Sequence, residues 1–189
     1  MARLPYGDEV RDDPRTREVA SAIAARRSGA VPNLYRMLLH APELAEPWVA
    51  LGSAVRTRAQ LGTARTELLV CLVAALLDNA YEWSQHAPLA RDAGWSEADL
   101  AAVADGDVEA VSDATARAAL AYARELVRCD RASAATLSAA RAALGDSVTA
   151  EVTAIVAYYR GLALLLTALE VDVDDDPDGP ARPSEPARD

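Results

Sequence analysis

Three ionisable residues have a spacing that suits acid–base chemistry. Glu82 and His86 lie four residues apart in the run DNAYEWSQH, and on a helix this spacing puts both side chains on one face. A neighbouring carboxylate raises the pKa of an imidazole and orients its ring, as a general acid or base requires. Glu67 begins a mainly apolar run, where a carboxylate needs a partner. We predict a catalytic site of Glu67, Glu82 and His86; the alternative is a solvated surface pair.

Six further residues are predicted to bind substrate, because they flank this cluster or offer a suitable polar group. They are Asn79, Tyr81, Trp83, His40, Arg65 and Tyr158. Structural roles remain open for several of them. His40 could hydrogen-bond a turn, Arg65 could form an ion pair, and the Tyr158–Arg160 run could lie in a subunit interface.

Helices are the elements expected to position these residues. The sequence lacks alternating strand patterns and any GxGxxG motif, whereas helix starts and stops recur. Pro14 after Asp13 predicts one helix start, and Ser96 with Asp99 forms a capping box. The predicted fold is all-α, one compact domain of seven or eight helices. The expected ranges are 14–27, 34–39, 42–61, 63–77, 78–93 (as a continuation or a restart), 97–104, 113–128, 133–144 and 147–169.

Composition narrows the classes of function. The chain has 189 residues, of which 51% are hydrophobic and 25% charged, which is typical of a globular domain. All 19 cations are arginine, so lysine Schiff-base chemistry is excluded. A net charge of −10 disfavours nucleic acid as a partner. The apolar stretch 148–169 is interrupted by Glu151 and Arg160, and the N-terminus lacks a signal-like apolar segment. We therefore expect a cytoplasmic protein without a membrane partner.

The last residues differ from the rest of the chain. The run 172–189 is acidic, rich in proline and poor in apolar residues, which is typical of disorder. We predict a helical domain over residues 1–171 and a disordered acidic tail over residues 172–189.

Four segments together resemble the carboxymuconolactone decarboxylase family, within the alkyl hydroperoxide reductase D-like superfamily. They read NLYRMLLHAPEL, ARTELLVCLVAALLDNAYEWSQH, AYARELV and AEVTAIVAYYRGLALLLTALEV. The reductase branch carries the pattern E-x(11)-C-x-x-C-x-x-x-H. Here Glu67 and His86 keep the spacing, while Asn79 and Glu82 stand at the two cysteine positions. Cys71 and Cys129 lie off this motif, so the resemblance favours the decarboxylase side over thiol peroxidase chemistry.

The resemblance implies a cofactor-independent lyase or isomerase that acts on a small carbonyl-activated acid or lactone, in aromatic catabolism or specialised metabolism. His86 would deliver a proton, Glu82 would orient it, and Glu67 would be a second acid/base or an orienting partner. Family members assemble as trimers or hexamers, so a homo-oligomer is expected. No cofactor is expected, and no metal either, since the chain has no second Glu/His motif of the kind that di-metal bundles repeat. The alternatives are a thiol-dependent antioxidant enzyme and a non-catalytic ligand-binding or assembly protein.

Overall fold

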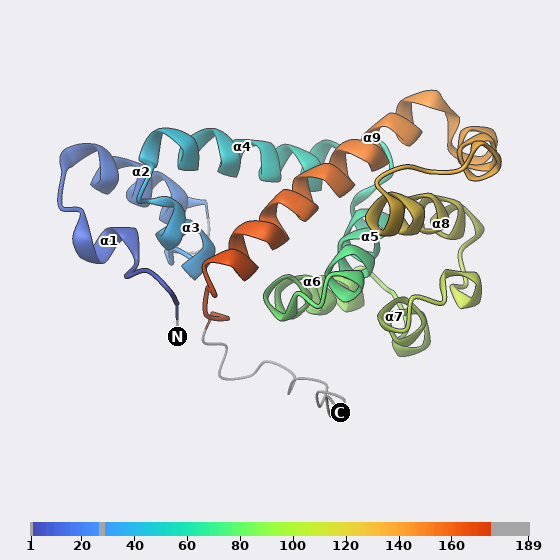
Figure 1. Ribbon diagram of the computed structural model, residues 1–189, viewed down its shortest axis with the longest axis horizontal. Coiled ribbons are helices and arrows are strands. Elements are labelled where there is room, and N and C mark those ends of the chain that lie inside the picture. Colours follow the sequence, from blue (N-terminus) through green and yellow to red (C-terminus); the bar gives the residue numbers. More distant parts are fainter. Residues whose placement is uncertain (1, 27–28, 175–189) are drawn as a thin grey trace.

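The computed structural model describes residues 2–26 and 29–174, and within them every regular element is helical (Figure 1). The elements are α1 (Gly7–Val10), α2 (Pro14–Ala25), α3 (Asn33–Leu38), α4 (Pro42–Arg58), α5 (Thr63–Leu76), α6 (Ala80–Asp92), α7 (Glu97–Ala104), the 3₁₀ turn η1 (Val108–Ala110), α8 (Ala114–Cys129) and α9 (Ala134–Ala168). The predicted all-α class is confirmed.

The described residues form nine α-helices rather than seven or eight. The additional helix is α1, a single turn too short to show an apolar period. The segments 63–77 and 78–93 are separate helices, with Asp78 at a φ of +50° between them. The two helices predicted over 133–169 follow one another as α9 and meet at a kink, where Gly145 has a φ of +79°. Glycine takes this left-handed conformation without the steric cost of a Cβ atom.

Several helix starts follow from local capping chemistry. The Asp13 side chain accepts a hydrogen bond from the Thr16 N–H, and Pro14 is the first helical residue of α2. Ser96 and Asp99 form the predicted capping box of α7. The Asp113 side chain accepts from the Ala116 N–H at the start of α8. These interactions satisfy backbone donors that have no partner within the helix.

Helix α5 forms the centre of the domain. Residues 66–74 are all buried, so α5 has no polar face, as expected of a helix enclosed on every side. It packs against α6, α7, α8 and α9. Figure 1 shows α1–α3 at one end of the molecule and α7 and α8 at the other, with α5 and α6 between them, while α9 runs from the end that holds α8 back to the middle.

Helix α9 is the one described helix that is long and apolar enough to cross a membrane. Nearly half of its apolar window, 44%, is buried inside the protein. Its polar residues Thr149, Tyr158 and Tyr159 are among the buried ones. These features are those of a core helix, and the compact helical domain explains its apolar character.

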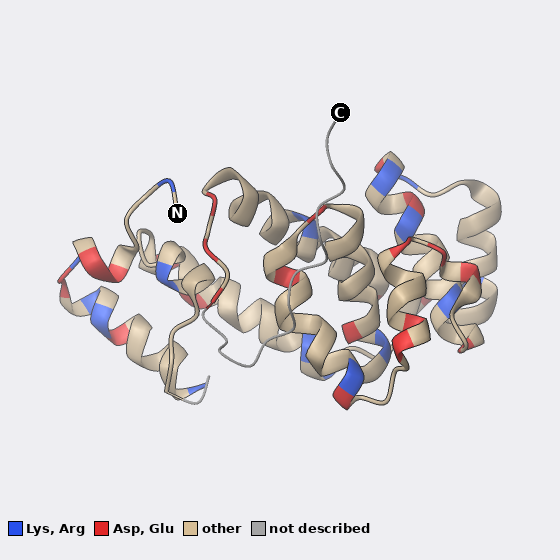
Figure 2. Ribbon diagram, turned by 90° about the horizontal axis from the view of Figure 1, so that it is seen from below, with Lys and Arg blue, Asp and Glu red and all other residues tan. Residues whose placement is uncertain are grey.

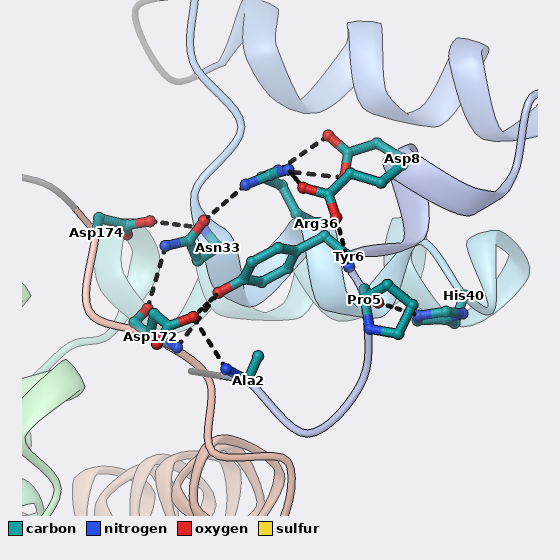
Figure 3. Close-up of polar contacts among 10 residues, drawn as sticks. Ala2, Pro5, Tyr6, Asp8, Asn33, Arg36, His40, Asp172 and Asp174 are labelled. Atoms are coloured by element: carbon teal, nitrogen blue, oxygen red, sulfur yellow. Dashed lines mark hydrogen bonds and ion pairs between the residues drawn. The ribbon is translucent and has the colours of Figure 1, made fainter.

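The three residues 172–174 are fixed against the N-terminal helices. The Asp172 carboxylate accepts hydrogen bonds from the Tyr6 hydroxyl (3.0 Å) and the Ala2 N–H (3.1 Å), as Figure 3 shows. The Asp174 carboxylate accepts from the Asn33 N–H at 2.6 Å. Figure 2 shows this acidic segment in red where it leaves α9. These carboxylates of the predicted tail thus find donors in the helical domain, and the division at residue 171 stays a prediction. The rest of the predicted tail, 175–189, lies outside the described residues.

Candidate active site

Glu67, Glu82 and His86 meet in the interior. The Glu67 Oε2 atom lies 2.5 Å from His86 Nδ1, and the Glu82 Oε2 atom lies 3.3 Å from His86 Nε2. The three residues are 2%, 4% and 6% exposed. Arg56 donates a hydrogen bond from Nε to the other Glu67 oxygen at 3.2 Å. The imidazole ring is thus held between two carboxylates, so the alternative of a solvated surface pair does not apply.

Local sequence explains why the ring lies between the two acids. Asn79 accepts a hydrogen bond from the Glu82 N–H at 2.9 Å and so begins α6. Glu82 then stands in the first turn of α6, and His86 follows one turn later on the same face. Glu67 reaches the opposite ring nitrogen from α5, which packs directly against α6. One carboxylate comes from the same helix as the histidine and the other from its neighbour.

The electrostatics of the cluster favour its charged forms. Burial acts to lower the pKa of His86, but hydrogen bonds and charge interactions with Glu67 and Glu82 outweigh it and raise that pKa. Burial acts to raise the pKa of Glu67, and the interactions with His86 and Arg56 lower it instead. The Arg56 guanidinium and the raised pKa of His86 supply positive charge beside the Glu67 carboxylate, which lowers the cost of burying it.

Aromatic rings from α4 and α9 enclose the remaining side of the cluster. The Tyr159 ring meets His86 edge to face, with 5.3 Å between the ring centroids. Tyr158 packs on Tyr159 at 5.1 Å and on Trp48 at 5.6 Å. A Cβ atom on Gly52 would lie 3.0 Å from the Tyr158 ring carbon Cζ, so only glycine lets α4 approach this closely. The aromatic rings thereby fix the position of the imidazole.

A cavity of about 50 Å³ adjoins the cluster, and Glu82 and His86 form part of its wall. Glu67 is not among the lining residues and lies behind the imidazole. A volume of this size holds a few water molecules or a small chemical group. The lining residues come from the region around α3 and from α4, α6 and α9: Pro32, Leu34, Tyr35, Gly52, Arg56, Tyr81, Glu82, Gln85, His86, Leu89, Tyr158, Tyr159 and Leu162.

Two of the six predicted binding residues line this cavity, Tyr81 and Tyr158. The other four, Asn79, Trp83, His40 and Arg65, do not. Asn79 caps α6, and the half-buried Trp83 packs against the hydrophobic core. A ring nitrogen of His40 lies 2.7 Å from the Pro5 carbonyl oxygen (Figure 3). Arg65 binds both oxygens of Asp113. Each of the four has a structural partner, so none enters the proposal below.

The sequence prediction missed Arg56 and gave no separate role to Tyr159. Arg56 could have been found from the helix pair α4 and α5. The connection 59–62 is short, so Arg56, two residues before the end of α4, and Glu67, four residues after the start of α5, lie within reach of one another across it. A buried carboxylate at Glu67 also requires a cation within reach. Tyr159 carries no comparable signal, because the sequence alone does not set the rotation of α9.

Other chemistry has less support from the side chains present. Among residues 2–26 and 29–174, no three His, Cys, Asp or Glu side chains gather in a way that could hold a metal ion. Both cysteines are free. Cys71 is fully buried, and this burial raises the pKa of its thiol to about 12. Cys129 is exposed at the end of α8.

Solved structures of the same fold lie at low sequence identity. A peroxidase-related protein with an alkylhydroperoxidase core, from Ralstonia eutropha JMP134, is 20% identical with a TM-score of 0.76, and the match covers 92% of this chain and 93% of that one. A peroxidase-related protein from Silicibacter sp. TM1040 is 16% identical with a TM-score of 0.73 over 85% and 86%. The debrominase Bmp8, solved as a cysteine-to-alanine variant with 2,3,4-tribromopyrrole, is 16% identical with a TM-score of 0.71 over 92% and 90%. No curated protein matches the chain.

These neighbours establish the class of fold, a helical alkylhydroperoxidase-like domain. The model of the carboxymuconolactone decarboxylase family matches residues 42–125, which include the whole Glu67–His86 segment and Arg56. The family match thus covers less than half of the chain, and the solved structures show its fold.

Proposed function

We propose that the protein is a cofactor-independent lyase or isomerase that moves a proton at a carbon activated by a carbonyl group. The observation that carries the proposal is the buried Glu82–His86 pair at the cavity wall, with the imidazole held from behind by Glu67. A histidine fixed at both nitrogens is pre-organised to hold one proton at a defined place. The substrate class is a small carbonyl-activated carboxylic acid or lactone.

The geometry favours the orienting role among the two predicted for Glu67, and it changes the role of Glu82. Glu67 makes the shorter contact to the ring, 2.5 Å, and does not line the cavity, so we assign it as the positioning residue. Arg56 keeps Glu67 ionised and oriented. Glu82 and His86 together carry the transferable proton on the cavity side. Burial raises the pKa of Tyr159 well above its usual value, so its hydroxyl stays neutral and can donate to a developing oxyanion.

Decarboxylation is the reaction that we place first. The carbon–carboxylate bond breaks, CO2 leaves, and the electron pair moves into the conjugated carbonyl to give a dienolate. The Glu82–His86 pair then delivers one proton to carbon, and the dienolate collapses to the unsaturated carbonyl product. Because the substrate carries its own electron sink, this sequence balances without an external oxidant or reductant. An isomerisation uses the same proton movement without loss of CO2.

The experiment is incubation of γ-carboxymuconolactone with the protein in deuterated water, followed by mass spectrometry. We expect CO2 loss with one deuterium retained in the product, and a rate reduced about 10²- to 10⁴-fold in Glu82→Gln. Glu97→Gln is the matched control, because it makes the same substitution at an exposed ion pair with Arg91. Deuterium uptake without CO2 loss would assign an isomerase, and equal rates in Glu82→Gln and wild type would refute the proposed site.

A thiol-dependent activity is the competing hypothesis that the peroxidase-related neighbours suggest. Its thiolate would have to form at Cys71, whose thiol has a pKa of about 12, or at Cys129, on a different helix. Peroxide reduction that is abolished in Cys71→Ser and unchanged in Glu82→Gln would favour that activity. The third hypothesis, a non-catalytic binding or assembly protein, predicts that Glu67→Gln, Glu82→Gln and His86→Gln leave every tested conversion unchanged.

We also propose that the chain forms a homo-oligomer, a trimer or a hexamer, and works in the cytoplasm. Along α9 an outward stripe of small and apolar residues repeats at alternating intervals of four and three, which is the spacing of a helix–helix seam. Leu164 on this stripe is 71% exposed, and Leu44 and Leu51 on α4 are 64% and 52% exposed. The stripe residues are Ala150, Ala154, Ala157, Gly161, Leu164 and Ala168. Light scattering after size exclusion should report an oligomer that Leu164→Glu dissociates; a wild-type monomer at micromolar concentration would refute this.

A further inference from the structure

Two residues that line the cavity, Tyr81 and Gln85, bind a carboxylate that belongs to the chain itself. Asp174 Oδ2 accepts a hydrogen bond from the Tyr81 hydroxyl at 2.5 Å and lies 3.5 Å from Gln85 Nε2. Its Oδ1 atom accepts from the Asn33 N–H at 2.6 Å, a contact drawn in Figure 3. Tyr81 and Gln85 line the cavity, and the Tyr81 side chain is 5% exposed. The Tyr81 hydroxyl, the Gln85 amide and the Asn33 N–H therefore all donate to one carboxylate beside the cavity.

The two donor side chains lie on α6 beside the acid–base pair. Tyr81 and Gln85 are four residues apart, as are Glu82 and His86, and each pair forms one stripe of the helix. The stripes are offset by a single residue, which is about 100° of rotation and about 1.5 Å of rise. One stripe thus presents hydrogen-bond donors for an anion, and its neighbour presents the groups that move a proton.

We propose that Tyr81, Gln85 and the Asn33 N–H form a carboxylate-binding subsite, and that Asp174 is its tethered occupant. The natural ligand of this subsite is a carboxylate of the substrate other than the reacting group. That assignment to a substrate rests on the proposed function, whereas carboxylate binding does not. The ligand class is then an unsaturated acid whose anchoring carboxylate enters the subsite while its activated carbon faces Glu82 and His86.

Asp174 competes with a free carboxylate for these donors, because a contact of a neighbouring residue keeps Asp174 close to them. Asp172, two residues earlier, is held by the Tyr6 hydroxyl and the Ala2 N–H. An anchor two residues away gives a tethered group a high effective concentration at its binding site. A free carboxylate must displace it, so its apparent affinity is lowered by the fraction of molecules in which Asp174 occupies the donors.

Calorimetric titration with hexa-2,4-dienoate tests this, with the uncharged hexa-2,4-dienamide as a matched probe. Asp174→Asn should bind the dienoate about tenfold more tightly than wild type, because the competing charge is gone. Glu170→Gln is the control: it removes one charge from the same segment, at a surface pair with Arg3. Adding Tyr81→Phe or Gln85→Leu to Asp174→Asn should weaken dienoate binding again, and Gln85→Leu serves if Tyr81→Phe disturbs the fold.

Three results would overturn the subsite. These are equal dienoate affinity in Asp174→Asn and Glu170→Gln, the same gain for the amide as for the dienoate, or no binding to Asp174→Asn at millimolar concentration. The readout is binding and does not require turnover. Loss of turnover in Glu82→Gln with unchanged dienoate affinity supports the subsite and the proposed function together. Unchanged turnover in that variant refutes the proposed function alone.

Discussion

Two arginine–carboxylate pairs, Arg56–Glu67 and Arg65–Asp113, lie at the two ends of the α4–α5 connection and serve different purposes. Arg65 binds both oxygens of Asp113, and Asp113 also caps α8 by accepting from the Ala116 N–H, so these three groups satisfy one another. Arg56 binds one oxygen of Glu67 and leaves the other to His86. The Arg65–Asp113 pair is about one-third exposed, whereas Glu67 is buried.

The difference shows what makes an ion pair useful for chemistry. A bidentate pair that is complete in itself joins two helices and has no capacity left for a ligand. A carboxylate that an arginine shares with an imidazole orients the imidazole ring and raises its pKa, and here that ring lines a cavity. The sequence prediction chose Arg65 for substrate binding, but the arginine that contacts the candidate site is Arg56. The predictions below follow from this contrast, in order of decreasing effect.

Glu67→Gln should cause the largest loss of stability, about 3 kcal/mol in the free energy of unfolding. It removes one partner of a buried charge network and leaves Arg56 and His86 facing a neutral amide. Urea unfolding measures the change, with the surface substitution Glu97→Gln as the control. A positioning role also predicts a lowered pKa of His86 in this variant, which a merely structural residue would not cause. A loss below about 1 kcal/mol would show that Glu67 is not integral to a coupled network.

Gly52→Ala should cost about 2 kcal/mol, because the added methyl group meets the Tyr158 ring in a packed interior. Tyr158 cannot easily move, since its ring contacts Trp48 and Tyr159 and its hydroxyl donates to the Trp48 carbonyl oxygen at 3.3 Å. Any shift would pass through Tyr159 to the imidazole. Thermal unfolding checks the cost, and Gly161→Ala is the matched control, because its Cβ atom would meet only ordinary contacts at 3.7 Å. Equal losses in the two variants would contradict the tight approach of α4.

Local rules predicted most of the fold, because caps and prolines act within a few residues. Asp13, Ser96 and Asp113 each begin a helix where the sequence indicates. The Glu82–His86 contact also follows from spacing within one helix. The contacts that spacing does not determine are those between helices. Asn79 was placed on the catalytic face but caps α6, and the edge contact of Tyr159 depends on how α9 packs. Asp172 and Asp174 look like disordered tail until their donors on distant segments are known.

Asp113→Asn should cost only about 1 kcal/mol and leave activity unchanged. Asparagine caps a helix as well as aspartate does, so the loss is that of a partly exposed ion pair. This substitution is the amide counterpart of Glu67→Gln at the other arginine. Urea unfolding and the deuterium assay check it together. A fall in activity comparable to that of Glu82→Gln would mean that the Arg65–Asp113 region takes part in catalysis, and the contrast between the two pairs would fail.

The pH dependence of stability should differ between the Glu67–His86 cluster and the Arg65–Asp113 pair. The pKa of His86 is raised, so its contribution is fully present below its unfolded value of about 6.5 and is lost as pH rises through the folded value. The Arg65 guanidinium and the Ala116 N–H lower the pKa of Asp113 to about 2, so its contribution is present above about 3.9 and is lost only as pH falls toward 2. The contribution of the imidazole therefore weakens on the alkaline side, whereas those of Asp113 and of Glu67, whose pKa is also lowered, weaken in acid. An NMR titration of His40→Asn, which leaves His86 as the one histidine, should give a pKa above 6.5. A value below 6.5 would mean that burial outweighs the two carboxylates, and the imidazole would then act as a base rather than as the resting acid.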